Sequence, residues 1–422
     1  MAATPRTTED VVCPFCSLAC DDLVIEAEGA ALRVRAPSCP IAEREFARLV
    51  PEARPTVRGE PATLEEAVAQ AAGLLARSRL PLFAGLGTDV AGMRAVLALA
   101  ERTGGIVDHA GSRGLMANVR AMQDGGWVTA TLAEIRNRAD LVLFVGTDSR
   151  AATPRFVERC LAPRDTLFGP LARDLFYLGD GLEPAEGIGA GATTSLACVP
   201  ERLAEAVAGL QALVAGTRLT AATVGGVPDG ALRVLAERLR SARYPVIVWA
   251  AGETAGGHPD LLVGALAGLL REVNGKTRCA GLPLSGPDNV IGCNQVCAWQ
   301  TGVPLRTSLG AGAPDHDPVR WSTEALLADG AVDCLVWIAS LREQHVPATT
   351  VPTIALLRPG LPTAAAAEVT IPVGAPGLDH GGSAYRTDGV VAVPLAALRD
   401  PVAPSVAAVL ADVAERLGRP AA

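Results

Sequence analysis

Short apolar runs alternate with segments of helical spacing along most of the chain. The runs at 80–87, 139–146, 244–252, 332–340 and 351–357 are largely apolar, as expected for strands that are buried on both faces of a parallel sheet. Several of them are followed by apolar positions at helical spacing. This rhythm is typical of βαβ units and predicts two or more Rossmann-like α/β lobes.

The helices between these runs are placed by spacing and capping. Thr63 is the expected N-cap of a helix over 64–75. Further helices are expected at 89–101, near 117–125, from 154, at 258–275 and at 405–417. Glycines end the strands at 83–87 and 144–147, where open α/β sheets bind nucleotides. Taken singly, each is explained equally well by the turn from strand to helix.

The first fifty residues depart from this rhythm. Two alternating runs in 23–36 flank a Glu-Gly-Ala turn and predict a β-hairpin. We therefore expect a small N-terminal Cys-rich β domain followed by Rossmann-like α/β domains. The expected bounds are 1–50 for the Cys-rich domain, 56–180 plus 332–422 for one α/β domain, and 181–331 for the other.

Cysteines crowd the same N-terminal segment. Cys13, Cys16 and Cys20 lie within eight residues, and Cys39 follows after 18 more. Four thiolates from one loop and one hairpin can converge on a metal, and both iron–sulfur clusters and zinc use such sets. Four alternatives remain open for these cysteines. They could bind a [4Fe-4S] cluster or a zinc ion, they could be a relic that binds nothing, or they could be four unrelated buried thiols.

Composition and charge narrow the classes of function. Of the 422 residues, 49% are hydrophobic and 19% are charged, which favours a surface partly covered by partner subunits. A net charge of −8 argues against binding to nucleic acid or to an anionic membrane. No window resembles a signal peptide or a membrane span, so we expect a cytoplasmic protein. Neither a P-loop nor a Gly-x-Ser-x-Gly pattern occurs.

Four segments carry a resemblance to a known family. They are CPFCSLACDDLVIE at 13–26, TLAEIRNRADLVLFVGTDSRAATPRF at 131–156, DNVIGCNQVCAWQTGVP at 288–304 and GGSAYRTDGVV at 381–391. In type and order they resemble the B subunit of formylmethanofuran dehydrogenase, over nearly the whole chain. The resemblance implies an N-terminal cluster domain and α/β domains like domains I to III of formate dehydrogenase and DMSO reductase. In that family, tungsten or molybdenum held by two pterin guanine dinucleotides and a cysteine reduces CO2 to formate.

The same resemblance identifies ten positions in the loops that hold the pterin in the family. In this chain we expect them to be vestigial, and to hold loops or interfaces or to pack as ordinary loop residues. They are Asn289, Gly292, Asn294, Trp299, Gln300, Thr301, Ser383, Tyr385, Arg386 and Asp388.

Two departures from the family pattern change the expected chemistry. Gly114 aligns with the cysteine that binds the metal, and no cysteine occurs between Cys39 and Cys160. Glycine offers no side-chain donor, so the tungsten- or molybdenum-pterin is expected to be absent. Glu45 aligns with a lysine that bridges cluster and pterin, and a carboxylate there is expected to repel the pyrophosphates of the cofactor.

Bacterial methylotrophs use a relative without redox chemistry, the formyltransferase/hydrolase complex, whose B subunit this chain resembles most. The first hypothesis is a non-redox structural subunit of such a complex, with amidohydrolase (A), formyltransferase (D) and C subunits as partners and a methanofuran-type carrier. The alternative is a tungsten- or molybdenum-pterin oxidoreductase that acts on CO2 and formate and uses a metal ligand other than cysteine.

Overall fold

The chain folds into two compact units in the computed structural model. Unit 1 comprises Met1–Ser112 and Pro287–Ala422, and unit 2 comprises Arg113–Gly286. These boundaries differ from the expected ones at 180/181 and 331/332, because the strand at Leu141–Val145 pairs with strands of unit 2. The residues that the structure describes are 5–185, 187–188, 190–253, 258–310, 312–362 and 367–418.

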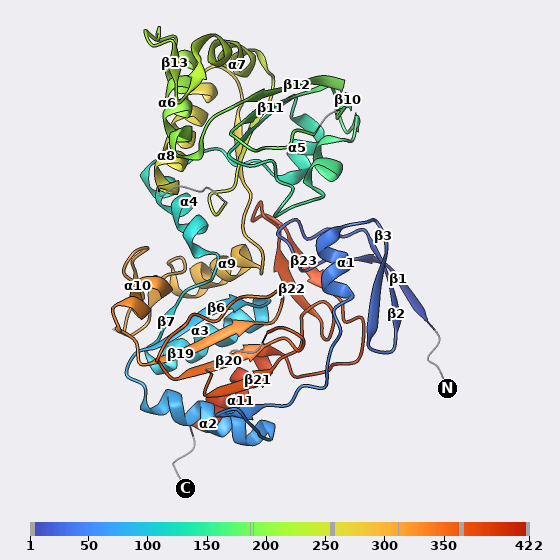
Figure 1. Cartoon of the computed structure of the whole chain (residues 1–422), viewed down its shortest axis with the longest axis vertical. Coiled ribbons are helices and arrows are strands. Elements are labelled where there is room, and N and C mark those ends of the chain that lie inside the picture. The colour runs from blue at the N-terminus through green and yellow to red at the C-terminus, as the bar shows by residue number, and fades with distance from the viewer. Residues whose placement is uncertain are drawn as a thin grey trace. The chain divides into compact units, whose positions relative to one another are not determined.

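A mixed sheet forms the centre of unit 1 (Figure 1). Among the described residues it has nine strands, in the order β18 (Asp315–His316), β17 (Thr307–Ser308), β7 (Ile106–Val107), β6 (Pro81–Gly87), β19 (Cys334–Ala339), β20 (Thr353–Leu357), β21 (Val369–Pro372), β4 (Thr56–Val57) and β5 (Glu60–Pro61). The strands from β7 to β21 are parallel and the outer ones antiparallel. Taken in chain order, the parallel strands run 2-1-3-4-5, which is the flavodoxin-like arrangement.

The helices of unit 1 begin at the capping residues that the sequence contains. Thr63 closes a capping box at the start of α2 (Leu64–Arg77), and the α3 helix (Val90–Thr103) is capped by Asp89. Both pack against α11 (Val406–Leu417), beside the sheet in Figure 1. Two further helices of unit 1 are α9 (Val290–Thr301) and α10 (Thr323–Ala328).

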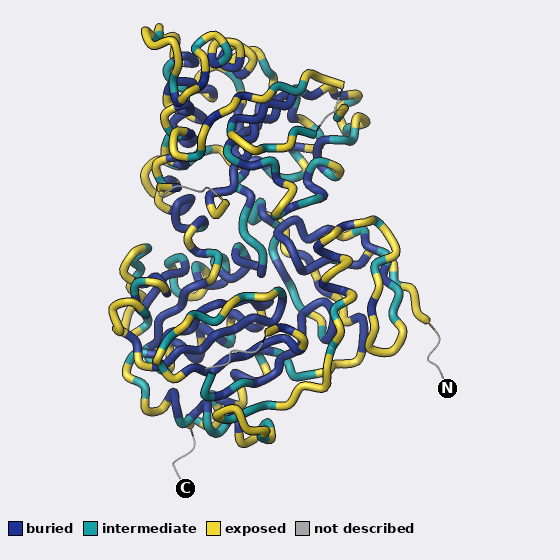
Figure 2. Tube along the Cα trace, in the orientation of Figure 1, coloured by how far each residue is buried: buried dark blue, intermediate teal, exposed yellow. Residues whose placement is uncertain are grey.

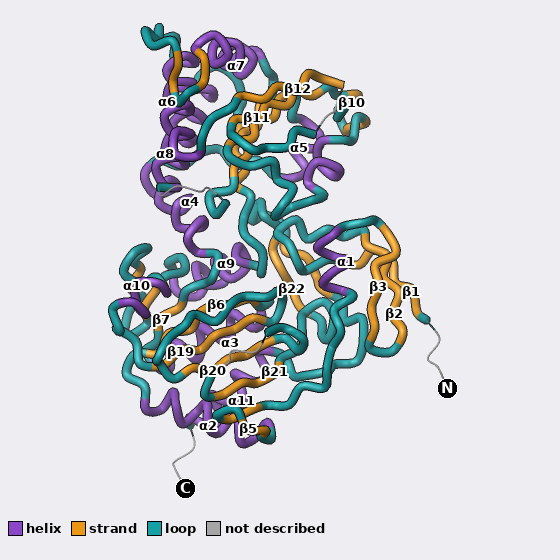
Figure 3. Tube along the Cα trace, viewed as in Figure 1, coloured by secondary structure: helices purple, strands orange, loops and turns teal. Residues whose placement is uncertain are grey.

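Three antiparallel strands carry the N-terminal cysteines. They are β1 (Arg6–Val11), β2 (Leu23–Glu28) and β3 (Ala31–Ala36), followed by α1 (Pro40–Phe46), and Figure 3 shows them as a separate small sheet. The β2–β3 pair confirms the predicted hairpin. This sheet belongs to unit 1, where Ala19 packs with three residues of the hairpin formed by β22 (Gly382–Tyr385) and β23 (Ala392–Leu395).

Unit 2 contains a wholly parallel sheet whose central strands are buried on both faces. Within the described residues its order is β12 (Ala190–Leu196), β11 (Arg173–Leu178), β8 (Leu141–Val145), β15 (Pro245–Trp249) and β16 (Ala280–Pro283). In chain order this is 3-2-1-4-5, the Rossmann order, which confirms a Rossmann-like lobe. Figure 2 shows the centre of this sheet in the colour of buried residues.

Helices and short hairpins surround this sheet. They are α4 (Ser112–Asp124), α5 (Leu132–Arg138), α6 (Leu203–Val214), α7 (Asp229–Ser241), α8 (Pro259–Asn274), the 3₁₀ turn at Pro200–Arg202, and the hairpins β9–β10 (Asp165–Thr166, Gly169–Pro170) and β13–β14 (Thr223–Val224, Val227–Pro228). The helix predicted from residue 154 is a short π-helical segment, Val157–Leu161. None of the described helices is long and apolar enough to cross a membrane.

Candidate functional site

The first candidate site lies at the carboxyl edge of the unit 1 sheet. The direction of strand addition reverses there between β6 and β19, and open α/β sheets bind ligands at such switch points. The Ser340 hydroxyl, just after β19, donates to the Gly87 carbonyl at 2.8 Å and ties the two strand ends together. The surrounding residues come from the loops after β6, β7 and β19 and from the start of α9.

His109 is a buried base at this edge. The Gly111 N–H donates to its Nδ1 at 2.8 Å, so Nε2 carries the proton and donates to the Asp288 carbonyl at 3.1 Å. Burial lowers the pKa of His109 below its ordinary value, which keeps the ring neutral at pH 7. Because backbone groups use both ring nitrogens, His109 fixes the position of a loop.

Two neighbouring residues with left-handed backbone open the α9 segment. Asp288 has φ 62° and Asn289 has φ 57°. The Asp288 carboxylate accepts from the Arg342 N–H at 3.1 Å, and burial raises its pKa. The Asn289 amide donates to the Thr88 carbonyl at 3.0 Å and accepts from the Tyr385 N–H at 2.9 Å. One side chain therefore joins the end of β6, the start of α9 and strand β22.

Two further predicted positions complete this network. A Cβ atom on Gly292 would lie 2.2 Å from the Asn289 Oδ1, so the Asn289 side chain requires glycine one turn later. The Trp299 ring packs edge-on against Tyr385, with 5.7 Å between ring centroids, although Trp299 is 59% exposed. The structure thus brings four of the ten predicted positions together.

The remaining positions of the α9 segment stabilise its end. The Asn294 Oδ1 accepts from the Leu305 N–H at 3.1 Å, and the Thr301 hydroxyl donates to the Cys297 carbonyl at 2.7 Å. Gln300 is exposed and Ser383 is half-buried on β22, apart from the network formed by the described residues. Their side chains are placed where a ligand or partner could reach them.

Arg386 and its neighbours hold the cysteine loop. The Arg386 guanidinium pairs with the Asp21 carboxylate at 2.6 Å, and the Thr387 N–H donates to the Ser17 carbonyl at 2.7 Å. Asp388 accepts from an N–H two residues later and closes its own turn. The Ala-Tyr-Arg-Thr-Asp-Gly run therefore connects the β22–β23 hairpin to the cysteine loop.

The four N-terminal cysteines are all buried and unbridged. Burial, followed by the charge of Cys16, raises the pKa of the Cys13 thiol, and Cys20 and Cys39 act on it too. The four side chains are therefore neighbours. Among the described residues, however, no three His, Cys, Asp or Glu side chains are arranged to hold a metal ion. The [4Fe-4S] cluster or zinc ion that the sequence leaves open at these four cysteines therefore stays a prediction.

Glu45 is not a free carboxylate. Its side chain is 2% exposed and pairs with the equally buried Arg358 at 3.3 Å, and with Arg44 at 3.0 Å and Arg48 at 3.3 Å. Burial alone would raise the pKa of Glu45, but hydrogen bonds from Arg44 and Arg48 and the charges of Arg48 and Arg358 outweigh it and lower the pKa. The expected repulsion of an anionic cofactor by Glu45 is therefore wrong, because surrounding guanidiniums neutralise it.

The second candidate site lies in unit 2, at the start of α4. A Cβ atom on Gly114 would lie 2.5 Å from the backbone nitrogen of Gly252 and 2.7 Å from its Cα, closer than real side chains approach backbone. Gly252 follows β15, whose pairing with β8 marks the switch point of this sheet. The Thr147 hydroxyl after β8 donates to the Glu253 carboxylate at 2.8 Å across this point.

Gly114 therefore has no space for a side chain in this arrangement. A cysteine there would force the backbone at 251–252 to move before its thiolate could face any ligand. A pterin-bound metal that needs a protein thiolate at this position does not fit the residues present.

Sequence patterns did not reveal the role of the charged side chains that connect the N-terminal segment to the rest of unit 1. Arg358 follows β20 directly, and Arg399 pairs with the fully buried Asp379 at 2.7 Å while donating to the Ala30 carbonyl. A signal existed for Arg358, since a charged residue directly after an apolar strand marks a carboxyl edge. Its partner Glu45 lies 313 positions away, which no local pattern reveals.

Comparisons with known proteins can be set beside this geometry. No family model matches the chain. The Fhc B subunit of the formyltransferase/hydrolase complex of Methylorubrum extorquens is 32% identical over 348 residues, which cover 80% of this chain and 89% of that protein. The B subunit of tungsten-containing formylmethanofuran dehydrogenase 2 of Methanocaldococcus jannaschii is 29% identical over 402 residues, covering 91% and 92%. The protein of that name from Methanococcus maripaludis is 27% identical over 401 residues, covering 90% of this chain and 92% of that protein.

Two solved structures are similar to this chain. A chain in the crystal structure of the formyltransferase/hydrolase complex FhcABCD of Methylorubrum extorquens, solved with methylofuran, has a TM-score of 0.75 at 32% identity, over 86% of this chain and 98% of that one. Acetylene hydratase of Pelobacter acetylenicus shares the fold at a TM-score of 0.63 and 13% identity, over 97% and 69%.

The two doubly wound sheets define an α/β protein that shares its fold with acetylene hydratase. Within that class, four segments of the sequence carry the more specific resemblance. The chain belongs to the family that contains the B subunits of formylmethanofuran dehydrogenase and of the Fhc complex.

Proposed function

We propose that this chain is the non-redox B subunit of a cytoplasmic formyltransferase/hydrolase complex, in tetrahydromethanopterin- and methanofuran-linked oxidation of one-carbon units to formate. The close approach of Gly114 to the Gly252 backbone carries the proposal, because it leaves no space for a thiolate. The 32% identity to the Fhc B subunit supports it.

The reaction sequence requires no electrons from this protein. A formyl group moves from formyl-tetrahydromethanopterin to a methanofuran-type carrier on a formyltransferase subunit, and an amidohydrolase subunit hydrolyses the formamide to formate. Hydrolysis changes no oxidation state, so a metal pocket in the B subunit has no part in it. The scaffold is retained because its surfaces bind the A, C and D subunits.

The family residues of unit 1 support a scaffold role. Asn289, Tyr385 and Arg386 bind backbone and side chains of the chain itself. Such residues remain necessary when the cofactor is lost, since each removes a buried unsatisfied polar group. In the complex they hold the loops that partner subunits and the carrier meet.

A second function remains a candidate because two relatives are tungsten enzymes. Both formylmethanofuran dehydrogenase subunits match about the same share of the chain, at 29% and 27% identity. In this alternative, the chain is a tungsten- or molybdenum-pterin oxidoreductase that interconverts CO2 and formate. It would need a metal ligand other than residue 114 and displacement of the 251–252 backbone.

Purification through an affinity tag on this chain, from the cells that produce it, distinguishes the two. We expect amidohydrolase-like, formyltransferase-like and C-type chains in stoichiometric amounts, and formate release from formyl-tetrahydromethanopterin that needs no electron acceptor. Co-purification of a ferredoxin-like chain, with formation of formate from CO2 and reduced viologen, would contradict the proposal.

A further inference from the structure

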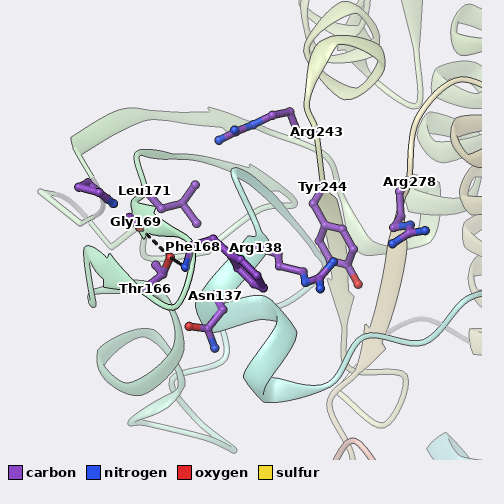
Figure 4. Close-up of a pocket in the computed structure, with 10 residues that line it drawn as sticks. Asn137, Arg138, Thr166, Phe168, Gly169, Leu171, Arg243, Tyr244 and Arg278 are labelled. Atoms are coloured by element: carbon purple, nitrogen blue, oxygen red, sulfur yellow. Dashed lines mark hydrogen bonds between the residues drawn. The ribbon is translucent and has the colours of Figure 1, made fainter.

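A pocket of about 430 Å³ opens at the amino edge of the unit 2 sheet (Figure 4). Arg138 ends α5 just before β8, while Arg243 and Arg278 precede β15 and β16. Open α/β sheets bind cofactors and substrates at their carboxyl ends, so this pocket lies at the opposite edge from the usual ligand site. The residues that line this pocket are therefore not explained by the usual cofactor or substrate site of such a sheet.

The β9–β10 hairpin beside the pocket presents two apolar side chains to solvent. Leu167 is 84% exposed and Phe168 is 67% exposed. The turn that carries them is held firmly: the Thr166 hydroxyl donates to the Gly169 carbonyl at 2.7 Å, and the Leu167 N–H donates to the Asn137 side chain at 3.0 Å. A rigid turn with exposed leucine and phenylalanine is costly in water and is typical of an interface.

The pocket is basic in a chain whose net charge is −8. Figure 4 shows the guanidiniums of Arg138 and Arg278 on either side of Tyr244, and their charges act on its hydroxyl, whereas the Arg243 side chain points away from Tyr244. The Arg138 guanidinium also lies 4.8 Å from the centroid of the Phe168 ring.

Two carboxylates face the same groups. Asp140 accepts from the N–H groups of Arg243 and Tyr244 and lies 3.6 Å from the Arg243 side chain, and Glu134 hydrogen-bonds to Tyr244. Within the part of the chain that the structure describes, no ion pair engages Arg138 or Arg278. An excess of positive charge thus remains beside an apolar tip.

We propose that the pocket and the hairpin tip dock an acidic segment of a partner subunit, whose carboxylates bind Arg138 and Arg278 and whose apolar side chain covers Leu167 and Phe168. This rests on the proposed function, since the partner is a subunit of the same complex. Arginine and aromatic residues dominate the binding energy of protein interfaces, and this surface offers both in one place. A small anion alone would leave the apolar tip in water.

The test uses the full-length chain and the separately purified A, C and D subunits, with binding measured by biolayer interferometry. Arg278→Glu and Phe168→Ser are each expected to weaken binding to one of the three subunits by about tenfold or more. Raising the NaCl concentration weakens the wild-type interaction, because exposed guanidiniums attract the carboxylates. Hydrogen exchange of residues 165–171 slows when that partner is bound.

Matched controls lie elsewhere on unit 2. Arg218→Glu reverses an exposed arginine and Leu261→Ser removes an apolar side chain that is 62% exposed, and both are expected to change binding by less than about twofold. Circular dichroism confirms that all four variants are folded.

Three outcomes would overturn the inference. Unchanged binding of Arg278→Glu and Phe168→Ser, in a chain that does assemble with the three subunits, overturns this surface and leaves the proposed function intact. Failure of the wild-type chain to bind any of them overturns both. A homodimer in light scattering that these two variants dissociate shows that the occupant is a second copy of this chain.

Discussion

The carboxyl edge of the unit 1 sheet and the start of α4 in unit 2 have kept very different parts of the family pattern. In unit 1, Asn289 still bridges Thr88 and Tyr385, and Arg386 still holds the cysteine loop. In unit 2, Gly114 is the residue that the resemblance aligns with the family's metal-binding cysteine, and it lies against the Gly252 backbone. The family positions in unit 1 make structural contacts, whereas the position whose expected role is purely chemical has no side chain.

This contrast indicates how to interpret family residues in a protein for which we propose a non-redox role. A residue that satisfies buried polar groups remains necessary for folding whatever happens to the cofactor. A metal ligand has no such second role. The comparison therefore predicts large stability losses in unit 1 and intolerance of any side chain at position 114.

The largest effect is expected from Arg358→Ala. This change leaves the Glu45 carboxylate buried with only the more exposed Arg44 and Arg48 as partners, and removes the hydrogen bond to the Leu341 carbonyl. Because burial of an uncompensated charge is costly, we expect a loss of about 3–5 kcal/mol in the free energy of unfolding. Urea denaturation followed by circular dichroism measures it.

Arg44→Ala is the matched control for Arg358→Ala. Its side chain is 56% exposed, so its ion pair with Glu45 is screened by water and is worth at most about 1 kcal/mol. Equal losses for the two variants would mean that the Glu45–Arg358 pair is not the buried centre of this cluster.

Asn289→Ala should give the next largest loss. The change removes the side-chain hydrogen bonds to the Thr88 carbonyl and the Tyr385 N–H and places alanine at φ 57°, so we expect a loss of about 2–4 kcal/mol. Gln300→Ala, at an exposed family position on the same helix, should stay within about 0.5 kcal/mol. Thermal or urea unfolding of both variants checks this. Similar losses in the free energy of unfolding would show that the family residues cannot be divided into those with structural contacts and those without.

Gly114→Ala is expected to lower the free energy of unfolding by about 1–3 kcal/mol, because its Cβ would overlap the Gly252 backbone. Gly264→Ala makes the same change in α8, where a Cβ meets open space, and should raise stability by about 0.5–1 kcal/mol. Opposite signs in a paired melting experiment are the result to look for. A stabilised Gly114→Ala variant would show that position 114 has space for a side chain.

A smaller effect concerns pH. Burial lowers the pKa of His109, so between that lowered value and the unfolded value near 6.5 the unfolded chain binds more protons than the folded one. Stability from this residue is complete above about pH 6.5 and is lost as the pH falls below it, by up to about 1.4 kcal/mol per pH unit.

The raised pKa of Asp288 has the opposite effect on stability. Above about pH 4 the folded chain retains a proton on Asp288 that the unfolded chain has lost, so stability from this residue falls as the pH rises. Because Asp288 is present in both proteins, its contribution cancels when the free energy of unfolding of His109→Gln is subtracted from that of the wild type. Urea unfolding of both proteins from pH 5 to 7.5 should therefore show a smaller loss on acidification for the variant. Parallel curves would show that His109 does not titrate in this range.

Local patterns predicted much of the fold. The β2–β3 hairpin, the capping box at Thr63 and the buried strands of both sheets all depend on neighbours in the sequence. The division into units was not predicted as the structure has it, because the strand order that joins β8 to β11 and β15 is set by long-range pairing.

The site was predictable to the extent that a family pattern marked it. That pattern identified Gly114 and the α9 and β22 positions, but the reason for Gly114 is a contact with Gly252, 138 positions later in the sequence. Glu45 was misinterpreted for the same kind of reason, since Arg358 neutralises it from the end of β20. Charges that are paired across the fold are invisible to spacing and composition.

Elemental and pterin analysis of the complex isolated from its native cells tests whether this chain binds a pterin-held metal. Tungsten, molybdenum, iron, zinc and acid-labile sulfide are measured per chain, together with the oxidised pterin. We expect tungsten, molybdenum and pterin far below one per chain. Stoichiometric tungsten or molybdenum with two pterins would contradict it, because the metal would then be bound despite the closed backbone at Gly114.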